Sequence, residues 1–332
     1  MADLDPLAHR SLLVEQVRLE ASGVVSLTLV DPDGGELPPW APGAHIDVRL
    51  PSGTVRQYSL CGPLDDPRSY TVAVLREEHG RGGSVEVHDS PLVGRVLRAR
   101  GPRNHFALVD APHYLFLAGG IGITPILAMI RQVAARGASW ELYYGGRTRD
   151  TMAFTEVLSA IGAERVHIVP QDERGMLPVV ELVDAAPDGA AIYCCGPEGM
   201  VLAVTGACAA ARPGALHVER FGAPAGGLPG RPVTASAQGP PAGAGHFTVE
   251  LRRSGLTLEV PPDRTLLDVV REAAPDVGFS CEEGYCGSCE TRVLAGVPEH
   301  HDTVLSDEER ERGDTMMICV GRSASALLTL DL

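Results

Sequence analysis

The chain has 332 residues, enough for about two domains, and 44% of them are hydrophobic, which is ordinary for a folded protein. Its formal net charge of −15 argues against nucleic acid or an anionic membrane surface as a partner. The first ten residues lack the apolar stretch of a signal peptide, and no run approaches the roughly 18 apolar residues of a membrane span. We therefore expect a cytoplasmic protein that binds neither nucleic acid nor a membrane.

The first block of the chain consists of short predicted strands separated by glycine and proline turns. Alternating or β-branched apolar residues predict strands at 12–20, 24–30, 45–50, 55–60 and 70–75. Breaks such as Pro51-Ser52-Gly53 separate them. Regular spacing of this kind predicts an antiparallel barrel or sandwich.

Two segments of this block carry groups that could hold a phosphorylated cofactor. Arg56 could neutralise a phosphate, and Tyr58 could lie against an aromatic ring. Further along, Gly82, Gly83 and Ser84 offer unobstructed amides and a hydroxyl. The alternative is an exposed strand with a surface arginine, followed by a flexible hairpin.

The pattern changes near residue 110. An apolar strand at 114–118 precedes a helix at 124–136, and strands at 141–144, 166–169 and 191–195 follow, with a helical stretch after Thr151. Alternation of strand and helix predicts a parallel α/β sheet.

Gly119, Gly120 and Gly122 lie between the first strand of this sheet and its helix. Backbone amides at a helix N-terminus face an anion, and Pro125 suits an early helical position because its missing N–H costs nothing there. The third glycine of the dinucleotide fingerprint is absent, so a tight turn without a ligand remains an alternative.

A second segment, Cys195-Gly196-Pro197, follows the last clear strand of this block. In open parallel sheets, ligands bind beyond the carboxyl ends of the strands. Cys195 is therefore predicted to line the pocket, whereas Cys194 is interpreted as a small core residue.

Residues 222–245 are dominated by glycine, proline and alanine and predict a linker. After it, segments 247–251 and 256–260 predict a hairpin, and 265–274 a short amphipathic helix.

The last block contains the strongest chemical motif of the sequence. Cys281, Cys286 and Cys289 form a C-x4-C-x2-C pattern, and Cys319 follows thirty residues later, which is the spacing of a plant-type [2Fe–2S] site. Glycines inside the loop allow backbone amides to turn toward the sulfurs. Cys319 is expected on a strand at 316–320. A zinc site is the alternative, but zinc folds usually show paired C-x2-C knuckles.

Taken in order, these motifs resemble those of the phthalate dioxygenase reductase family, whose relatives include vanillate demethylase reductases. The resemblance covers nearly the whole chain and rests on the cysteines and on segments 56–61, 80–84, 119–125, 193–197, 217–223 and 330–332. It implies a multidomain protein: an antiparallel β-barrel flavin domain at 1–109, an α/β parallel-sheet NAD domain at 110–221, the linker at 222–245, and an α+β β-grasp ferredoxin domain at 246–332.

The resemblance also implies the cofactors and the residues that hold them. FMN would be bound by Arg56, Gln57, Tyr58, Ser59, Val72, Ala73, Val74, Arg81, Gly82, Gly83, Ser84 and Thr124. NADH would lie across Gly119, Gly120, Gly122, Thr124, Pro125, Cys195, Gly196 and Pro197.

Cys195, Phe221 and Thr124 would serve the catalytic site. Phe221 would stack near the flavin ring where nicotinamide enters; the alternative is a hydrophobic plug. Arg147 and Arg149 follow the second strand of the α/β block, where an arginine could recruit a 2′-phosphate, so NADPH stays open.

By this resemblance, the chain is expected to be a monomeric NADH-dependent reductase. It would pass electrons through FMN and the [2Fe–2S] cluster to a Rieske-type aromatic-ring oxygenase or O-demethylase. One alternative is a reductase for a cytochrome P450, and another is a non-catalytic iron–sulfur carrier or redox sensor.

Overall fold

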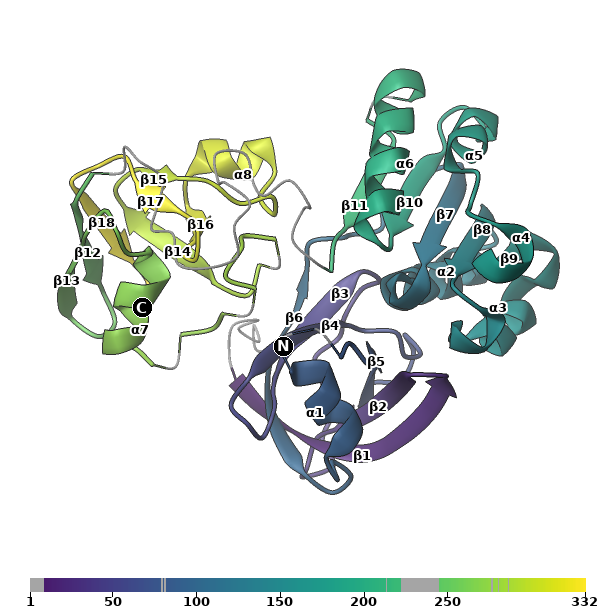
Figure 1. Cartoon of the computed structure of the whole chain (residues 1–332). Coiled ribbons are helices and arrows are strands. Elements are labelled where there is room, and N and C mark those ends of the chain that lie inside the picture. The colour runs from purple at the N-terminus through teal and green to yellow at the C-terminus, as the bar shows by residue number, and fades with distance from the viewer. Residues whose placement is uncertain are drawn as a thin grey trace. The chain divides into compact units, whose positions relative to one another are not determined.

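The computed structural model describes residues 9–78, 80, 82–212, 214–221, 245–275, 277–279, 281–285 and 287–332. The chain divides into two compact units, Met1–Arg220 and Phe221–Leu332, whose elements Figure 1 labels. The predicted flavin and NAD blocks fall in the first unit except for Phe221, and the three-domain bounds stay a prediction. All of the predicted linker except residue 245 lies outside the described residues. None of the described helices is long and apolar enough to cross a membrane.

The first sheet of unit one is antiparallel throughout, as predicted. Its order is β4-β3-β6-β1-β2-β5, and an antiparallel bridge between Leu60 and Val72 joins the two ends. Inward-facing residues such as Leu12, Val14 and Ile46 fill its core. The strands are β1 (His9–Ala21), β2 (Val24–Val30), β3 (Ala44–Arg49), β4 (Val55–Ser59), β5 (Ser69–Leu75) and β6 (Val96–Asn104), and the helix α1 (Gly83–Asp89) follows β5.

The second sheet of unit one is parallel, in the order β11-β10-β7-β8-β9. Its strands are β7 (His113–Gly119), β8 (Ser139–Gly146), β9 (Val166–Pro170), β10 (Ala191–Cys195) and β11 (Leu216–Glu219). Its helices are α2 (Ile123–Ala135), α3 (Thr155–Gly162), α4 (Gln171–Arg174), α5 (Val179–Ala185) and α6 (Glu198–Ala211), with short 3-10 turns at Gly120–Gly122, Arg149–Thr151 and Ala163–Arg165.

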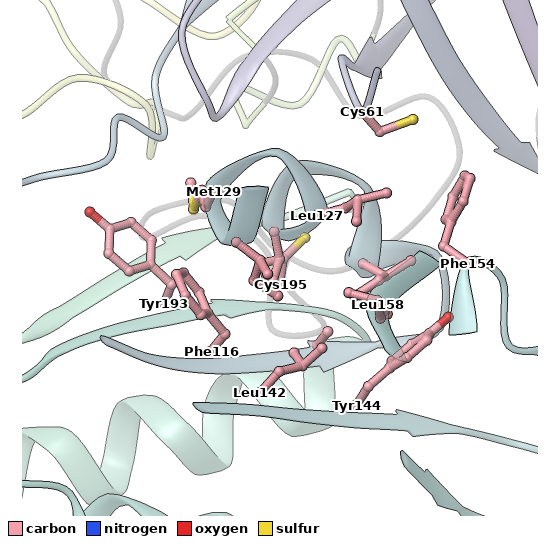
Figure 2. Close-up of a cluster of buried hydrophobic side chains, with 14 of the residues drawn as sticks. Cys61, Phe116, Leu127, Met129, Leu142, Tyr144, Phe154, Leu158, Tyr193 and Cys195 are labelled. Carbon is pink, nitrogen blue, oxygen red and sulfur yellow. The ribbon is translucent and has the colours of Figure 1, made fainter. Parts of the chain in front are cut away.

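Successive side chains of β7 point to opposite faces of this sheet and are apolar on both, which explains why helices cover both faces. Tyr114 and Phe116 pack with α2, and the close-up in Figure 2 shows Phe116 and Cys195 beneath that helix. Leu115 and Leu117 point to the opposite face and pack with α5 and α6. The predicted α/β parallel sheet is confirmed.

The two sheets of unit one share a core. Cys61, which follows β4, reaches the cluster around α2 (Figure 2), and Nη1 of Arg131 on α2 donates to the Cys61 carbonyl at 2.5 Å. The buried Tyr193 hydroxyl accepts the N–H of Val109 at 2.7 Å and donates to the Ala107 carbonyl at 2.9 Å. These contacts anchor the connection between the sheets to β10 and the end of β4 to α2.

The second unit is a mixed α+β domain, as predicted. Its five-stranded sheet has the order β13-β12-β18-β14-β16, with β12 and β18 parallel and the other pairs antiparallel. Its elements are β12 (Phe247–Leu251), β13 (Leu256–Val260), α7 (Leu266–Ala273), β14 (Glu290–Ala295), β15 (Pro298–Glu299), α8 (Asp307–Arg312), β16 (Thr315–Met317), β17 (Arg322–Ser323) and β18 (Leu327–Leu330). Helix α7 buries Leu266, Leu267 and Val270 in this core.

One local expectation was wrong. Cys319 was expected on a strand at 316–320, but β16 ends at Met317. The amides of Val320 and Gly321 both bond the Met317 carbonyl, which makes a turn. The sequence suggested a strand because residues 316–319 are buried and apolar, and burial alone does not distinguish a strand from a packed turn.

Candidate functional site

The predicted phosphate ligand Arg56 lies on β4 beside the turn that begins α1. A Cβ on Gly83 would lie 2.7 Å from Nε of Arg56, so a side chain at this position would displace Arg56. Gly82 adopts a φ of 79°, in the left-handed region that favours glycine. The Ser84 hydroxyl accepts a backbone N–H of the same loop at 3.0 Å. The structure thus brings these glycines to the arginine, whereas Arg81 lies outside the described residues.

Tyr58 lies on the same strand and carries a buried hydroxyl that has no hydrogen-bond partner among the described residues. Burial raises the pKa of this phenol above its ordinary value. Val72 and Val74 are buried on β5, which the Leu60 bridge joins to the end of the Tyr58 strand. A buried, unpartnered hydroxyl beside an arginine and a glycine turn fits a bound group that has a polar ring and a phosphate.

The two predicted nucleotide-binding turns meet backbone to backbone. A Cβ on Gly122 would lie 2.2 Å from the carbonyl oxygen of Cys195, and one on Gly119 would lie 2.5 Å from Cδ of Pro197. A Cβ on Gly196 would in turn lie 2.9 Å from the Gly119 Cα. The two turns follow the adjacent strands β7 and β10, at the carboxyl edge where parallel sheets bind ligands.

The side chains at this edge are buried and engaged. The Thr124 hydroxyl donates to the Ile121 carbonyl at 3.0 Å and so helps to close the turn that precedes α2. Pro125 is also buried, at the third position of that helix. Burial raises the pKa of the Cys195 thiol well above its ordinary value and so favours the neutral thiol over the reactive thiolate.

A carboxylate that motif reasoning left unassigned lies between these two regions. Glu219 is at the end of β11, in register with Cys195 on β10. Its Oε2 accepts the Ser59 hydroxyl of the barrel strand β4 at 3.2 Å. Burial raises the pKa of Glu219 to about 8. Glu219 lies within segment 217–223, which carries part of the family resemblance, but no sequence pattern shows that a carboxylate there is buried.

Phe221, the predicted aromatic neighbour of the flavin, is the first residue of the second unit and is 43% exposed. Its stacking role stays a prediction.

Arg149, one of the two arginines that could bind the 2′-phosphate of NADPH, is paired with Glu173. Its Nη2 lies 2.9 Å from Oε2 of that glutamate, and its Nε lies 3.2 Å from Oε1.

The described cysteine ligands converge in the second unit, although Cys286 lies outside the described residues. Cys281, Cys289 and Cys319 are all buried. Hydrogen bonds to the thiols of the first two, together with burial, raise the pKa of the Cys319 thiol. The N–H of Glu283 points to Sγ of Cys281 at 3.4 Å.

The loop between these cysteines has three residues in the left-handed region, with φ of 58° at Glu282, 74° at Gly284 and 72° at Gly287. This backbone path turns amides toward the sulfurs. No complete group of three or more metal-binding side chains is found among the described residues. The donor set nevertheless fits an iron–sulfur cluster once Cys286 is included, because two buried thiols lie on the glycine-containing loop and the buried Cys319 thiol lies on the turn after β16.

Comparison with known proteins agrees with this geometry. Residues 249–323 match a family model described as a 2Fe-2S iron-sulfur cluster binding domain, and residues 116–206 match an oxidoreductase NAD-binding domain. The chain is 42% identical to phenoxybenzoate dioxygenase subunit beta of Ectopseudomonas oleovorans, over 98% of each chain. The solved structure of a phthalate dioxygenase reductase matches 98% of each chain, with a TM-score of 0.69 and 35% identity.

The chain belongs to the phthalate dioxygenase reductase family. It is 37% identical to the phthalate dioxygenase reductase of Burkholderia cepacia, over 94% of each chain. The solved member is described as a modular structure for electron transfer from pyridine nucleotides to [2Fe–2S]. As a member of this family, the protein is an NAD-binding oxidoreductase with an iron–sulfur domain and a reductase component of an oxygenase system.

One further solved structure bears on the partner. A type IV self-sufficient cytochrome P450 monooxygenase matches 98% of this chain with a TM-score of 0.84 and 41% identity. This chain spans only 41% of that protein. The phthalate dioxygenase reductase fold therefore also occurs as part of a longer P450 chain.

Proposed function

We propose that this reductase takes a hydride from NADH at an FMN site on the barrel and delivers single electrons through a [2Fe–2S] cluster to a separate oxygenase. A bound flavin supplies the conversion of a hydride pair into single electrons. The observation that carries the proposal is the Ser59–Glu219 hydrogen bond, because it joins the predicted flavin strand to the predicted nicotinamide pocket. This hydrogen bond joins residues 160 positions apart and supports adjacent flavin and nicotinamide sites.

The chain's own groups have distinct tasks in this scheme. Arg56 and the amides of Gly82 and Gly83 bind the flavin phosphate, and the Gly119–Gly122 turn binds the nucleotide backbone. The Cys195 thiol is buried in the core at the carboxyl end of β10 and packs behind the nucleotide edge. Ser59 and Glu219 hold a hydrogen-bonding pair at the boundary between the two sites.

NADH is the proposed coenzyme. An arginine after β8 would have to be available to attract the 2′-phosphate of NADPH. Arg149 is already paired with Glu173 through two contacts, and the glutamate itself would repel a phosphate. The neighbouring Arg147 is exposed, so the preference for the coenzyme that lacks the 2′-phosphate rests on the Arg149–Glu173 pair.

The proposed partner is a Rieske-type aromatic-ring oxygenase or an O-demethylase, and we expect the reductase to act as a monomer. Relatives that match nearly end to end include a vanillate O-demethylase oxidoreductase of Pseudomonas, 38% identical over 97% of this chain. The similarity to the P450 monooxygenase favours a P450 as the second candidate. The genes that neighbour this reductase would distinguish the two.

The cofactor assignment is tested by the identity of the bound flavin. Flavin released by acid should run as FMN on chromatography, at about one per chain. Arg56→Ala should weaken flavin binding by about 1.5–3 kcal/mol, because it removes a charge-assisted phosphate contact. Arg68→Ala, at an exposed arginine in the loop before β5, is the matched control and should retain flavin. Release of FAD would contradict the FMN assignment and leave the family membership intact.

A further inference from the structure

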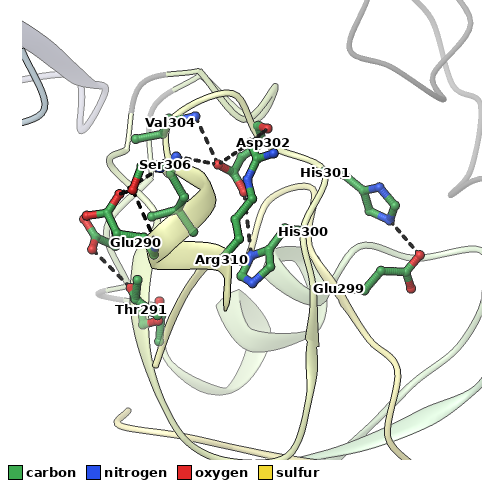
Figure 3. Close-up of polar contacts among 12 residues, drawn as sticks. Glu290, Thr291, Glu299, His300, His301, Asp302, Val304, Ser306 and Arg310 are labelled. Atoms are coloured by element: carbon green, nitrogen blue, oxygen red, sulfur yellow. Dashed lines mark hydrogen bonds and ion pairs between the residues drawn. The ribbon is translucent and has the colours of Figure 1, made fainter. Parts of the chain in front are cut away.

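A buried group of polar side chains lies next to the iron–sulfur loop in the second unit. Asp302 and His300 expose only 1% and 10% of their side chains, and Arg310 reaches them from α8 (Figure 3). None of these three residues belongs to the proposed cluster ligands or to the proposed flavin and nucleotide sites. A buried carboxylate is costly unless it is paired and hydrogen-bonded, so its surroundings indicate what it stabilises.

Asp302 folds the segment that contains it, residues 300–305, which we call the strap. Its Oδ2 accepts the N–H of Val304 at 3.0 Å and that of Leu305 at 2.9 Å. Nη2 of Arg310 donates to the Asp302 carbonyl at 2.6 Å and lies 3.8 Å from Oδ2. The side chain and the main chain of Asp302 are therefore both fixed.

A capping box fixes the start of helix α8, which carries Arg310. Ser306 caps the helix: its hydroxyl accepts the Glu309 N–H at 3.2 Å, and the Glu309 carboxylate accepts the Ser306 N–H at 2.8 Å. This capping box begins α8 directly after the strap, so Arg310 projects back over it (Figure 3).

The strap contacts the iron–sulfur loop through the main chain. The N–H of Thr303 donates to the carbonyl of Gly284 at 2.9 Å. Gly284 lies between Cys281 and Cys286 and has a left-handed φ of 74°. Thr303 lies between Asp302 and Val304, and the Asp302 carboxylate accepts the N–H of Val304. The Thr303 N–H therefore has little freedom to move.

The segment after α8 contacts the residue that follows Cys289. Thr315 on β16 places its hydroxyl 3.1 Å from Oε1 of Glu290, the residue after Cys289. β16 leads directly to the turn that carries Cys319. The strap and α8 thus connect the loop that carries Cys281 with the chain that carries the distant ligand.

We propose that Asp302 is a positioning residue for the [2Fe–2S] cluster. With Arg310, it fixes the strap so that the Thr303 amide holds the Gly284 turn in the conformation that the cluster requires. Groups that support metal ligands from outside typically change metal affinity 10–100-fold when they are lost. The proposal rests on the cluster assignment of the proposed function.

The test compares variants of the full holoprotein. Asp302→Ala removes the acceptor for both amides, whereas Asp302→Asn keeps one acceptor oxygen and removes only the charge. Asp307→Ala, at an exposed acid in the first turn of α8, is the matched control. The readouts are the rate at which visible [2Fe–2S] absorbance is lost to excess EDTA, the EPR spectrum of the reduced cluster, and hydrogen exchange at the Thr303 amide.

We expect Asp302→Ala to speed cluster loss by about tenfold or more and to alter the EPR spectrum. Exchange at Thr303 should accelerate in parallel. Asp302→Asn should restore most of both properties, and Asp307→Ala should match the wild type. If Asp302→Ala retains the wild-type rate and spectrum, or if Asp302→Asn restores neither, the positioning role is overturned. A wild-type protein that holds no [2Fe–2S] cluster would instead overturn the proposed function.

Discussion

Glu219 is a carboxyl group whose ionisation depends strongly on the fold around it. Its pKa is raised to about 8 by burial, compared with roughly 4.3 for an exposed glutamate. Between these values the folded state binds a proton that the unfolded state has released. Stability from this group is therefore fully present at low pH and is lost as the pH rises toward 8.

Glu219→Gln should flatten this dependence because the amide does not titrate. For the flavin-free protein, we expect the wild type to lose up to roughly 1.4 kcal/mol of stability per pH unit above the ordinary pKa, and the variant to lose much less. Urea unfolding of both proteins at a series of pH values between 5 and 8 measures this difference. Parallel curves for the two proteins would show that Glu219 is ionised in the folded state.

At the scale of elements, the close packing of the turn after β7 against the turn after β10 shapes the predicted nucleotide-binding edge of the parallel sheet. Gly122 leaves no space for a side chain, because a Cβ would lie 2.2 Å from the Cys195 carbonyl oxygen. Both partners are backbone atoms, so the clash is relieved only if a turn moves. The short distance between the turns that follow β7 and β10 therefore requires glycine at position 122.

Gly122→Ala should destabilise the protein by about 1–3 kcal/mol, the usual range for inserting atoms into a packed site, and should raise the KM for NADH. Gly206→Ala is the matched control, because this helical glycine on α6 has no atom within 4 Å of its Cβ position. That change should be neutral or stabilise the protein by about 0.5–1 kcal/mol. Thermal unfolding and NADH–ferricyanide kinetics compare the two. Equal behaviour of both variants would contradict the close packing of the turns.

Strands were the most predictable elements, because alternation and short apolar runs depend only on local burial. The predicted segments 191–195, 247–251 and 256–260 coincide with β10, β12 and β13. Helix α1 was not predicted, since its glycine-rich start resembles a loop until Arg56 packs against it. The cysteine motif was readable from spacing, but the buried Glu219 was not, because it depends on a barrel strand 160 residues away. Asp302 bonds only nearby residues, and its importance appears only when Thr303 meets Gly284 in the folded domain.

At the scale of the whole molecule, most of the excess negative charge lies in the predicted ferredoxin domain, where electrons leave the protein. Residues 246–332 hold 17 acidic residues and 8 arginines. Glu282 is one of these acids; it lies in the cysteine loop, and its carboxylate is 3.9 Å from Arg271, which partly offsets its charge. In α8, Asp307, Glu308 and Glu311 are exposed. An acidic domain would steer a basic oxygenase surface toward the cluster.

Electron transfer to the true partner should therefore slow several-fold from low to high ionic strength. NADH–ferricyanide turnover, which needs no protein partner, should change much less. Charge reversal at Glu282 and Glu283 should flatten the salt response, whereas reversal at Glu164 in unit one should leave it unchanged. A salt response that survives the Glu282 and Glu283 changes would place the docking surface elsewhere.

The central claim is that electrons leave the flavin through the cluster. Cys319→Ser, which removes the distant thiolate, tests it most directly when NADH oxidation is measured with two acceptors. Ferricyanide accepts electrons from the flavin, so its reduction should survive, while cytochrome c reduction should collapse together with the [2Fe–2S] signal. Full cytochrome c reduction by a protein without its cluster would contradict the proposed path.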